Sequence, residues 1–322
     1  EAMFQLLYLY VTQPRVDTSL FKSFKQRSKA QTAFILADPQ FSFIDTLIKT
    51  VYNNHPLAPI TIPKPEYYDN IDLDRTLAIY KERFGDMSGM HFIFVGNIDE
   101  QKMKLLVEQY IASLPTTNKK FNFKDKGVRP AKGIINLNVN KGQAQKSLIL
   151  NMYNGEVPYS EGIGMKVNAI SEILNIKVVE ELREKIQGIY SGAVKGEFNR
   201  YPYSRYNFLV FLPCGPQKVD TLVEAMNKEI ENLKTQGPSK ENLDKVKQQW
   251  IEQNKVAMKE NSTWLAELLA IKFPGVNVDR FLHYEKYVNA LTPKDVQDAA
   301  KLLLNGKNVV TAILRPEKIS KN

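Results

Sequence analysis

The sequence predicts an α+β protein made of two tandem copies of one domain, each an antiparallel sheet with helices on one face. Three observations support this prediction. The chain has 322 residues, which exceeds one ordinary domain of about 150 residues. Residues 1–3, with the letters EAM, recur as residues 224–226, an offset of 223 positions. Strand-like and helix-like segments follow one another without strict alternation, which is typical of an α+β fold.

The offset also relates longer segments of the two copies. Residues 17–35 and residues 240–258 are matching helix-like runs at the same separation. About 90 residues precede Glu224 in the second copy, counted from near Lys132, whereas the first copy starts at Glu1. We therefore expect the first copy to be truncated at its N-terminus and the chain to be the downstream part of a larger protein.

In the first copy, residues 1–11 are strongly apolar and aromatic, which predicts a largely buried helix. Asp17 is placed to cap the helix that follows. Four prolines between residues 53 and 70 predict an irregular connection. The predicted elements are helices at residues 1–11, 17–35, 72–84 and 99–114 and a strand at residues 91–95.

The second copy has the strands that the first copy lacks. A pair of strands is predicted within residues 134–152, a hairpin at residues 188–198 and 206–213, and a last strand at residues 309–314. The predicted helices are residues 160–185, 219–233, 239–273, 279–289 and 293–304. We place the first domain at residues 1–118, a polar and Lys-rich linker at residues 119–132, and the second domain at residues 133–322.

Composition argues against several classes of protein. Hydrophobic residues make up 43% and charged residues 25%, values of a globular protein that can bury a core. No run approaches the ~18 apolar residues that a membrane span needs. The net charge is +9, but Lys and Arg alternate with Asp and Glu, which favours a solvated surface over nucleic-acid binding. The single cysteine, Cys214, excludes an intrachain disulfide and a cysteine-based zinc site.

Two other groups of residues suggest chemistry only weakly. His55, His91 and His283 are isolated, with no second histidine on the same helix face, so we expect structural roles for them. Glycines recur at residues 188, 192 and 196, but they lack the Lys-Ser/Thr of a phosphate-binding loop. We expect these glycines to be strand positions that need little steric bulk.

Several motifs together resemble the pitrilysin/insulinase family of zinc peptidases, the inverzincins. Residues 91–99 and the helix end at residues 113–115 resemble the end of the family's third domain. The fourth domain is matched by residues 181–185 with Gly188 and Tyr190, by the strand end at residues 214–216, and by Asn261 with residues 264–265. The resemblance covers almost the whole chain. It implies four α+β domains paired into two halves, which close around a chamber that holds a peptide.

The family's catalytic centre is an H-x-x-E-H helix motif with a downstream Glu, which together hold Zn²⁺. None of this motif occurs in the sequence. The resemblance therefore implies that this chain binds no metal or other cofactor, that Zn²⁺ belongs to an N-terminal half, and that the chain alone is inactive.

The resemblance assigns two candidate catalytic residues to this chain, Arg183 and Tyr190. An Arg and a Tyr seven residues apart reach the reaction centre from the family's C-terminal half, and these two match that spacing. Arg183 would offer a fork of donors to a peptide carbonyl, and Tyr190 would donate to the oxygen that gains charge. In the competing interpretation, Arg183 pairs with Glu180 or Glu184 and Tyr190 is a half-buried strand residue.

Two classes of function follow from these observations. In the first, the chain is the C-terminal half of a zinc endopeptidase, its partners being the N-terminal catalytic half and a peptide substrate. In the second, it is a non-catalytic partner subunit or a binding or scaffold homologue. Relatives that resemble this sequence suggest a periplasmic or cell-envelope location, with the cytoplasm as the alternative.

Overall fold

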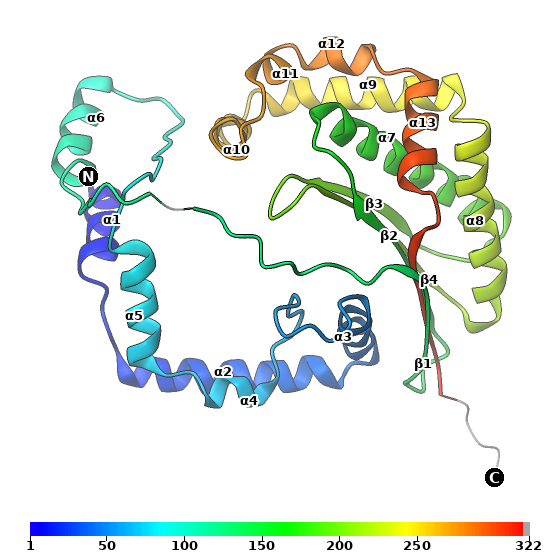
Figure 1. Cartoon of the computed structure of the whole chain (residues 1–322), viewed down its shortest axis with the longest axis horizontal. Helices are drawn as coiled ribbons and strands as arrows, with labels where there is room; N and C mark the ends of the chain where they lie inside the picture. The colour runs from blue at the N-terminus through cyan, green and yellow to red at the C-terminus, as the bar shows by residue number, and fades with distance from the viewer. Residues whose placement is uncertain (121, 318–322) are drawn as a thin grey trace. The chain divides into compact units, whose positions relative to one another are not determined.

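The structure is a computed structural model that describes residues 1–120 and 122–317. It divides into two compact units, each formed by three separate segments (Figure 1). The first unit comprises residues 1–37, 62–124 and 260–272. The second unit comprises residues 38–61, 125–259 and 273–322.

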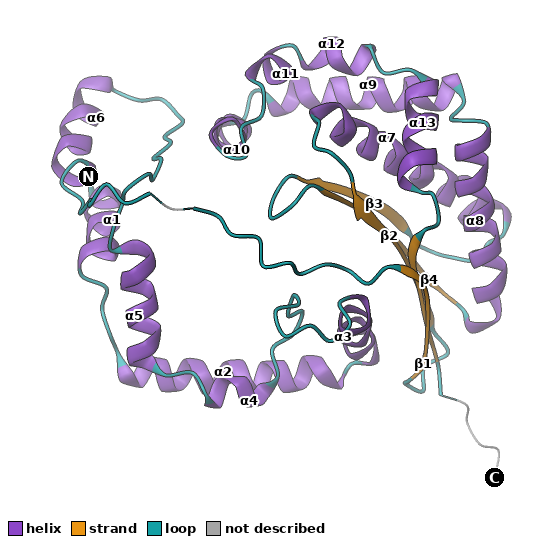
Figure 2. Ribbon diagram, in the orientation of Figure 1, coloured by secondary structure: helices purple, strands orange, loops and turns teal. Residues whose placement is uncertain are grey.

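The second unit is built on one five-stranded sheet with the strand order β1-β5-β2-β4-β3. Figure 2 shows the strands of this sheet in orange. Strands β1 and β5 run parallel, and the other neighbouring strands run antiparallel. The α+β class is therefore confirmed, but the sheet is mixed. The predicted strands of residues 134–152 both form, yet they do not pair with each other because β5 lies between them. The strands are β1 (Gly133–Asn140), β2 (Ser147–Glu156), β3 (Ala193–Asn199), β4 (Arg205–Cys214) and β5 (Asn308–Arg315).

Both faces of this sheet carry helices, which corrects the prediction of helices on one face. Side chains alternate across a strand, so Ile149 of β2 packs into the larger core while Leu148 and Leu150 face the other way. The larger core is completed by the helices α7 (Glu161–Lys177), α8 (Val219–Thr235), α9 (Lys240–Ala257) and α13 (Pro293–Leu303). The opposite face is covered in part by α3 (Pro39–Val51), through Phe43 and Leu47.

The helices of the second unit begin and end at recognisable capping residues. Ser160 and Ser239 each accept a hydrogen bond from a backbone N–H in the first turn of α7 and α9, and Thr292 and Asp295 form a capping box at α13. Its helices are α3 (Pro39–Val51), α7 (Glu161–Lys177), the π-helix η2 (Val178–Lys185), the 3₁₀ turn η3 (Pro216–Lys218), α8 (Val219–Thr235), α9 (Lys240–Ala257), α11 (Val278–Leu282), α12 (Tyr284–Asn289) and α13 (Pro293–Leu303).

The long helix predicted at residues 239–273 is two helices. It breaks between α9, which ends at Ala257, and α10 (Asn261–Lys272). The break coincides with Asn261 and Ser262, whose short polar side chains favour a helix start over a helix interior. The two helices belong to different units, since α10 lies in the first unit and α9 in the second.

The described residues of the first unit form helices and loops, and none of them forms a strand. Its helices are α1 (Ala2–Thr12), α2 (Thr18–Ala37), α4 (Pro65–Asp69), α5 (Leu73–Phe84), α6 (Glu100–Leu106), the π-helix η1 (Val107–Ile111) and α10. The strand predicted at residues 91–95 is wrong, because no described segment of the chain pairs with it. Phe94 of this segment instead stacks on Phe4 of α1, with ring centroids 5.4 Å apart.

The prediction of a largely buried helix at residues 1–11 is also wrong. Within α1 only Phe4 is buried, whereas Met3, Leu6 and Tyr10 are exposed. The apolar pattern of this helix predicted a core that the described part of the first unit does not provide. No helix in the described residues is both long and apolar enough to cross a bilayer.

The compact units do not coincide with the predicted domain boundaries at residues 118 and 132. The division near residue 124 falls inside the predicted linker, but residues 38–61 pack with the second unit and residues 260–272 with the first. The identity of these segments as two repeated domains stays a prediction.

Candidate functional site

Arg183 lies on η2, the π-helical continuation of α7. Its neighbour Leu182 is fully buried, so the helix is fixed against the core while Arg183 points to solvent. The Arg183 Nε donates to Glu184 Oε1 at 2.9 Å. The other guanidinium N–H groups have no partner among the described residues. The pairing with Glu184 is thus present, and it leaves most of the donor fork available.

A tight connection leads from this helix to Tyr190. The Gly188 N–H donates to the Leu182 carbonyl at 3.0 Å, and Gln187 adopts a left-handed φ of 51°. A Cβ on Gly188 would lie 2.7 Å from Leu222 Cδ2, so only glycine fits against α8 at this point. Of the three spaced glycines only Gly196 is a strand position, since residues 188 and 192 lie in this connection.

The direction of Tyr190 follows from its neighbour. Ile189 is buried and forms an isolated antiparallel bridge with Cys214 at the end of β4. Because side chains alternate in extended chain, Tyr190 is directed outward. Its side chain is 95% exposed, and its hydroxyl has no hydrogen-bond partner in the described part of the chain. Tyr190 is therefore not the half-buried strand residue of the competing interpretation.

Arg183 and Tyr190 line one open hollow of about 620 Å³. Two further polar residues that the sequence analysis missed, Lys146 and Ser147, line it from the start of β2. Ser147 is only 4% exposed, and its Oγ has no hydrogen-bond partner among the described residues. The sequence signal for it was a serine at the start of the apolar strand SLIL.

The charge of the hollow is wholly basic. Its charged lining residues are Arg183 and Lys146, and no carboxylate lines it. Such a surface suits a carbonyl oxygen or an anion, because both interact with fixed N–H donors. Cys214 also lines the hollow, but burial raises the pKa of its thiol to about 11. The thiol is therefore protonated at neutral pH and is a poor nucleophile.

The described residues do not fit a catalytic zinc ion. They contain no group of three or more His, Cys, Asp or Glu side chains that could hold a metal. Two histidines have local partners instead: His283 Nδ1 lies 2.8 Å from Asp279 Oδ1, and His55 Nδ1 accepts from the Leu57 N–H.

Comparison with known proteins identifies the family to which this chain belongs. Residues 70–250 match the family model described as "Peptidase M16 inactive domain". The chain belongs to this peptidase family, and the family relationship expected from the sequence is confirmed. None of the curated proteins compared with the chain matches it.

Solved structures with the same fold include several proteases. The periplasmic protease PqqL from Escherichia coli is 16% identical with a TM-score of 0.83, covering 98% of this chain and 34% of that protein. A mutant of the ferredoxin protease FusC in complex with Arabidopsis ferredoxin is 17% identical with a TM-score of 0.80, covering 98% and 34%. A peptidase M16 inactive domain from Pseudomonas fluorescens is 17% identical with a TM-score of 0.80, covering 99% and 75%. The chain thus spans about a third of the length of the first two proteins.

Proposed function

We propose that this chain is the C-terminal, non-zinc-binding half of a zinc metalloendopeptidase that cleaves peptides in a closed chamber. The observation that carries the proposal is the hollow that Arg183 and Tyr190 share. Both side chains are exposed, the hollow is basic, and the tyrosine hydroxyl has no partner within the described residues. An exposed tyrosine without a hydroxyl partner, in the same hollow as a guanidinium that only Glu184 engages, is suited to a ligand rather than to folding.

The two side chains would act on the peptide bond directly. The guanidinium of Arg183 has a planar fork of N–H donors that orients a peptide carbonyl. The Tyr190 hydroxyl donates to the carbonyl oxygen as it gains negative charge, which lowers the energy of the transition state. Zn²⁺ supplies Lewis-acid chemistry in this class of enzyme. We assign its ligands to the other half, since the described residues of this chain offer no ligand set.

The expected partners are an N-terminal catalytic half and a peptide substrate. The exposed apolar side chains of α1, among them Met3, Leu6 and Tyr10, support a partner surface in the first unit. Large exposed apolar patches mark interaction sites. We place the protein in the periplasm or cell envelope, which the naming of PqqL as a periplasmic protease supports.

A second candidate is a non-catalytic subunit that binds peptides or partners an active peptidase. The matched family model is itself described as an inactive domain, which favours neither case over the other. The two candidates differ in one respect: only the first requires Arg183 and Tyr190 to contribute to turnover.

Reconstitution with a catalytic half tests the proposal. The purified chain alone should not cleave a fluorogenic peptide, and adding the N-terminal half that carries H-x-x-E-H should produce zinc-dependent cleavage. Cleavage by the N-terminal half that does not change on addition of this chain would refute the proposal. Binding of this chain without any effect of Arg183→Ala on turnover would favour the second candidate.

A further inference from the structure

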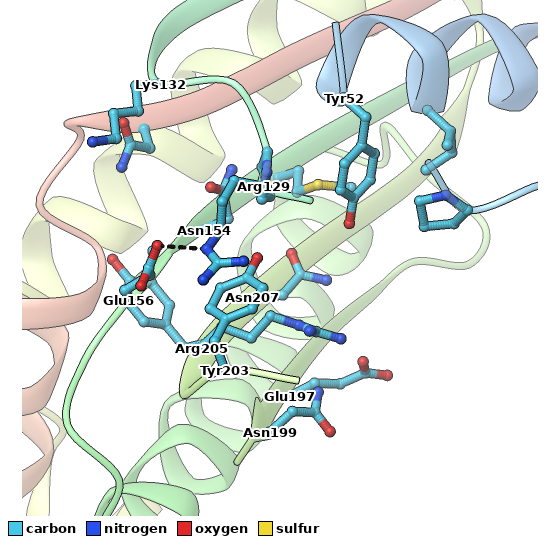
Figure 3. A pocket seen from close by; sticks show the side chains of 17 residues that line it. Tyr52, Arg129, Lys132, Asn154, Glu156, Glu197, Asn199, Tyr203, Arg205 and Asn207 are labelled. Atoms are coloured by element: carbon cyan, nitrogen blue, oxygen red, sulfur yellow. Dashed lines mark hydrogen bonds and ion pairs between the residues drawn. The ribbon is translucent and has the colours of Figure 1, made fainter. Parts of the chain in front are cut away.

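A second hollow lies on the sheet face that α3 covers only in part. The α3 side chains Phe43 and Leu47 pack against apolar side chains of β2 and β5. Next to this contact, the same sheet face carries polar side chains. The hollow has a volume of about 600 Å³ and lies within the second unit (Figure 3). Polar residues of β2, β3 and β4 form its floor. Asn154, Glu197 and Asn207 lie on the sheet face opposite the larger core.

Two asparagines on this floor present a free donor and a free acceptor. Asn154 of β2 and Asn207 of β4 are directly paired in the strand register. Directly opposite side chains in antiparallel strands lie about 5 Å apart on the same face. Asn154 is only 8% exposed, and its Nδ2 has no partner among the described residues; the same holds for Asn207 Oδ1. A buried polar group without a partner costs about 1–3 kcal/mol, so a ligand that satisfies both is favoured.

Two arginine side chains lie against the ring of Tyr203, which also lines this hollow. The guanidinium carbon of Arg129 lies 3.4 Å from the centroid of the Tyr203 ring, and that of Arg205 lies 5.1 Å from it. Arg129 is neutralised, because it binds Asp125 at 3.0 and 2.6 Å and Glu156 at 3.0 Å. These contacts fix the ring, and the ring in turn positions the second guanidinium.

Of the two arginines on this ring, Arg205 is the one without an ion pair among the described residues; Lys132, which also lines the hollow, has none there either. Both carboxylates that line the hollow are paired. Glu156 binds Arg129, and Glu197 binds Lys195 at 2.8 Å. Figure 3 shows the Arg205 side chain beside Tyr203 and Asn207. The hollow therefore combines an unpaired guanidinium with an unpaired amide donor and an unpaired amide acceptor.

We propose that this hollow binds the C-terminal end of a peptide. The terminal carboxylate would lie on Arg205, and the preceding peptide bond would accept from Asn154 and donate to Asn207. A phosphate ion could use the guanidinium, but it offers no N–H to the acceptor. An internal segment of peptide could use both asparagines, but it has no charge for Arg205.

The spacing of the three side chains fits this ligand. Asn207 and Arg205 are two residues apart on β4, which is about 7 Å along the strand. One extended residue of a peptide spans about 3.5 Å. The long and flexible arginine side chain covers the remaining distance, and its planar fork matches a carboxylate.

The choice of a peptide as ligand rests on the proposed peptidase function, but its test does not depend on turnover. Acetyl-trialanine with a free carboxylate is titrated into the 322-residue chain by ligand-observed NMR, alongside the same peptide with a C-terminal amide. The acid should bind at least 10-fold more tightly than the amide. Arg205→Gln should remove this preference, and the matched variant Arg27→Gln, which removes a cation from the exposed surface of α2, should preserve it.

A second variant separates binding from folding. Asn154→Leu removes an unsatisfied buried amide, so the melting temperature should stay equal or rise while affinity for the acid falls about 10-fold. Equal affinities for acid and amide, or an acid preference that survives Arg205→Gln, would overturn the proposal. So would inorganic phosphate binding more tightly than the acid, since this would define a simple anion site. Loss of reconstituted turnover with intact acid binding would count against the proposed function and not against this site.

Discussion

Replacement of Tyr190 by phenylalanine separates a functional role from a structural one, because the side chain contributes little to folding. The Tyr190 ring is 95% exposed, and the hydroxyl that the change removes has no partner in the described residues. Surface changes of this kind usually alter stability by less than about 0.5 kcal/mol. In a protein of this size that corresponds to a shift of less than about 2 °C in melting temperature.

The catalytic cost should be much larger than the cost in stability. Loss of one donor to a developing oxyanion lowers turnover by about 10²- to 10³-fold, equivalent to about 2.7–4 kcal/mol. The assay compares kcat/KM of the reconstituted enzyme on a fluorogenic peptide with the melting temperature of the same preparations. Arg183→Ala should behave similarly, and the double variant should lose less than the product of the two effects, because both groups act on one carbonyl.

The opposite pattern would refute this reasoning. If both single variants keep wild-type kcat/KM, Arg183 and Tyr190 do not contact the reacting carbonyl. If Tyr190→Phe lowers the melting temperature by several degrees, the hydroxyl stabilises the fold and the structural role of Tyr190 is favoured. Lys81→Ala on the first unit serves as a matched surface control and should change neither quantity.

Three further predictions follow from the structure. Phe43→Ala should destabilise the second unit by about 3–5 kcal/mol in urea unfolding, because the Phe43 side chain is fully buried between α3 and the sheet, whereas Phe41→Ala at an exposed position should cost less than about 1 kcal/mol. Hydrogen bonds from Lys166 and Thr292 lower the pKa of Asp295 from 3.8 to about 2, so the stability that these contacts give is complete above about pH 4 and is lost as the pH falls toward 2. The stability difference between wild type and Asp295→Asn should shrink over that range, and a constant difference would exclude this linkage. Metal analysis of the purified chain should find substoichiometric zinc; one tightly held zinc ion per chain would contradict the assignment of the ligands to another half.

The sequence predicted the elements of the second unit well because their patterns reflect local physics. Alternating residues such as Leu148 and Ile149 define strand faces, and Ser160 and Ser239 act as predicted helix starts. The pairing between strands that are distant in sequence was harder to predict. The insertion of β5 between β1 and β2 depends on contacts across more than 150 residues, which no local pattern encodes.

The first unit shows the limits of sequence patterns more clearly. The apolar run at residues 91–95 has strand-like composition, but a strand also needs a partner, and none occurs among the described residues. The end of α1 at Thr12 and that of α8 at Thr235 keep the offset of 223 residues, so helix boundaries are compatible with the predicted repeat. The repeat and the truncation stay predictions.

The candidate site was predicted only in part. The residues Arg183 and Tyr190 came from a resemblance in spacing, and the structure places both on one hollow. Lys146 and Ser147 were missed because they reach this hollow from β2, about 40 residues earlier in the chain. The polar floor with Asn154 and Asn207 was missed for a similar reason, since the two residues meet only through the strand register.

The most direct measurement is a structure of the assembled enzyme with a bound peptide, its catalytic half inactivated by replacing the glutamate of H-x-x-E-H. The account predicts that the Tyr190 hydroxyl and the Arg183 guanidinium lie within hydrogen-bond distance, about 2.7–3.2 Å, of the carbonyl oxygen of the bond to be cleaved or of its neighbour. A peptide held in the chamber with both side chains more than about twice that distance away would contradict the account.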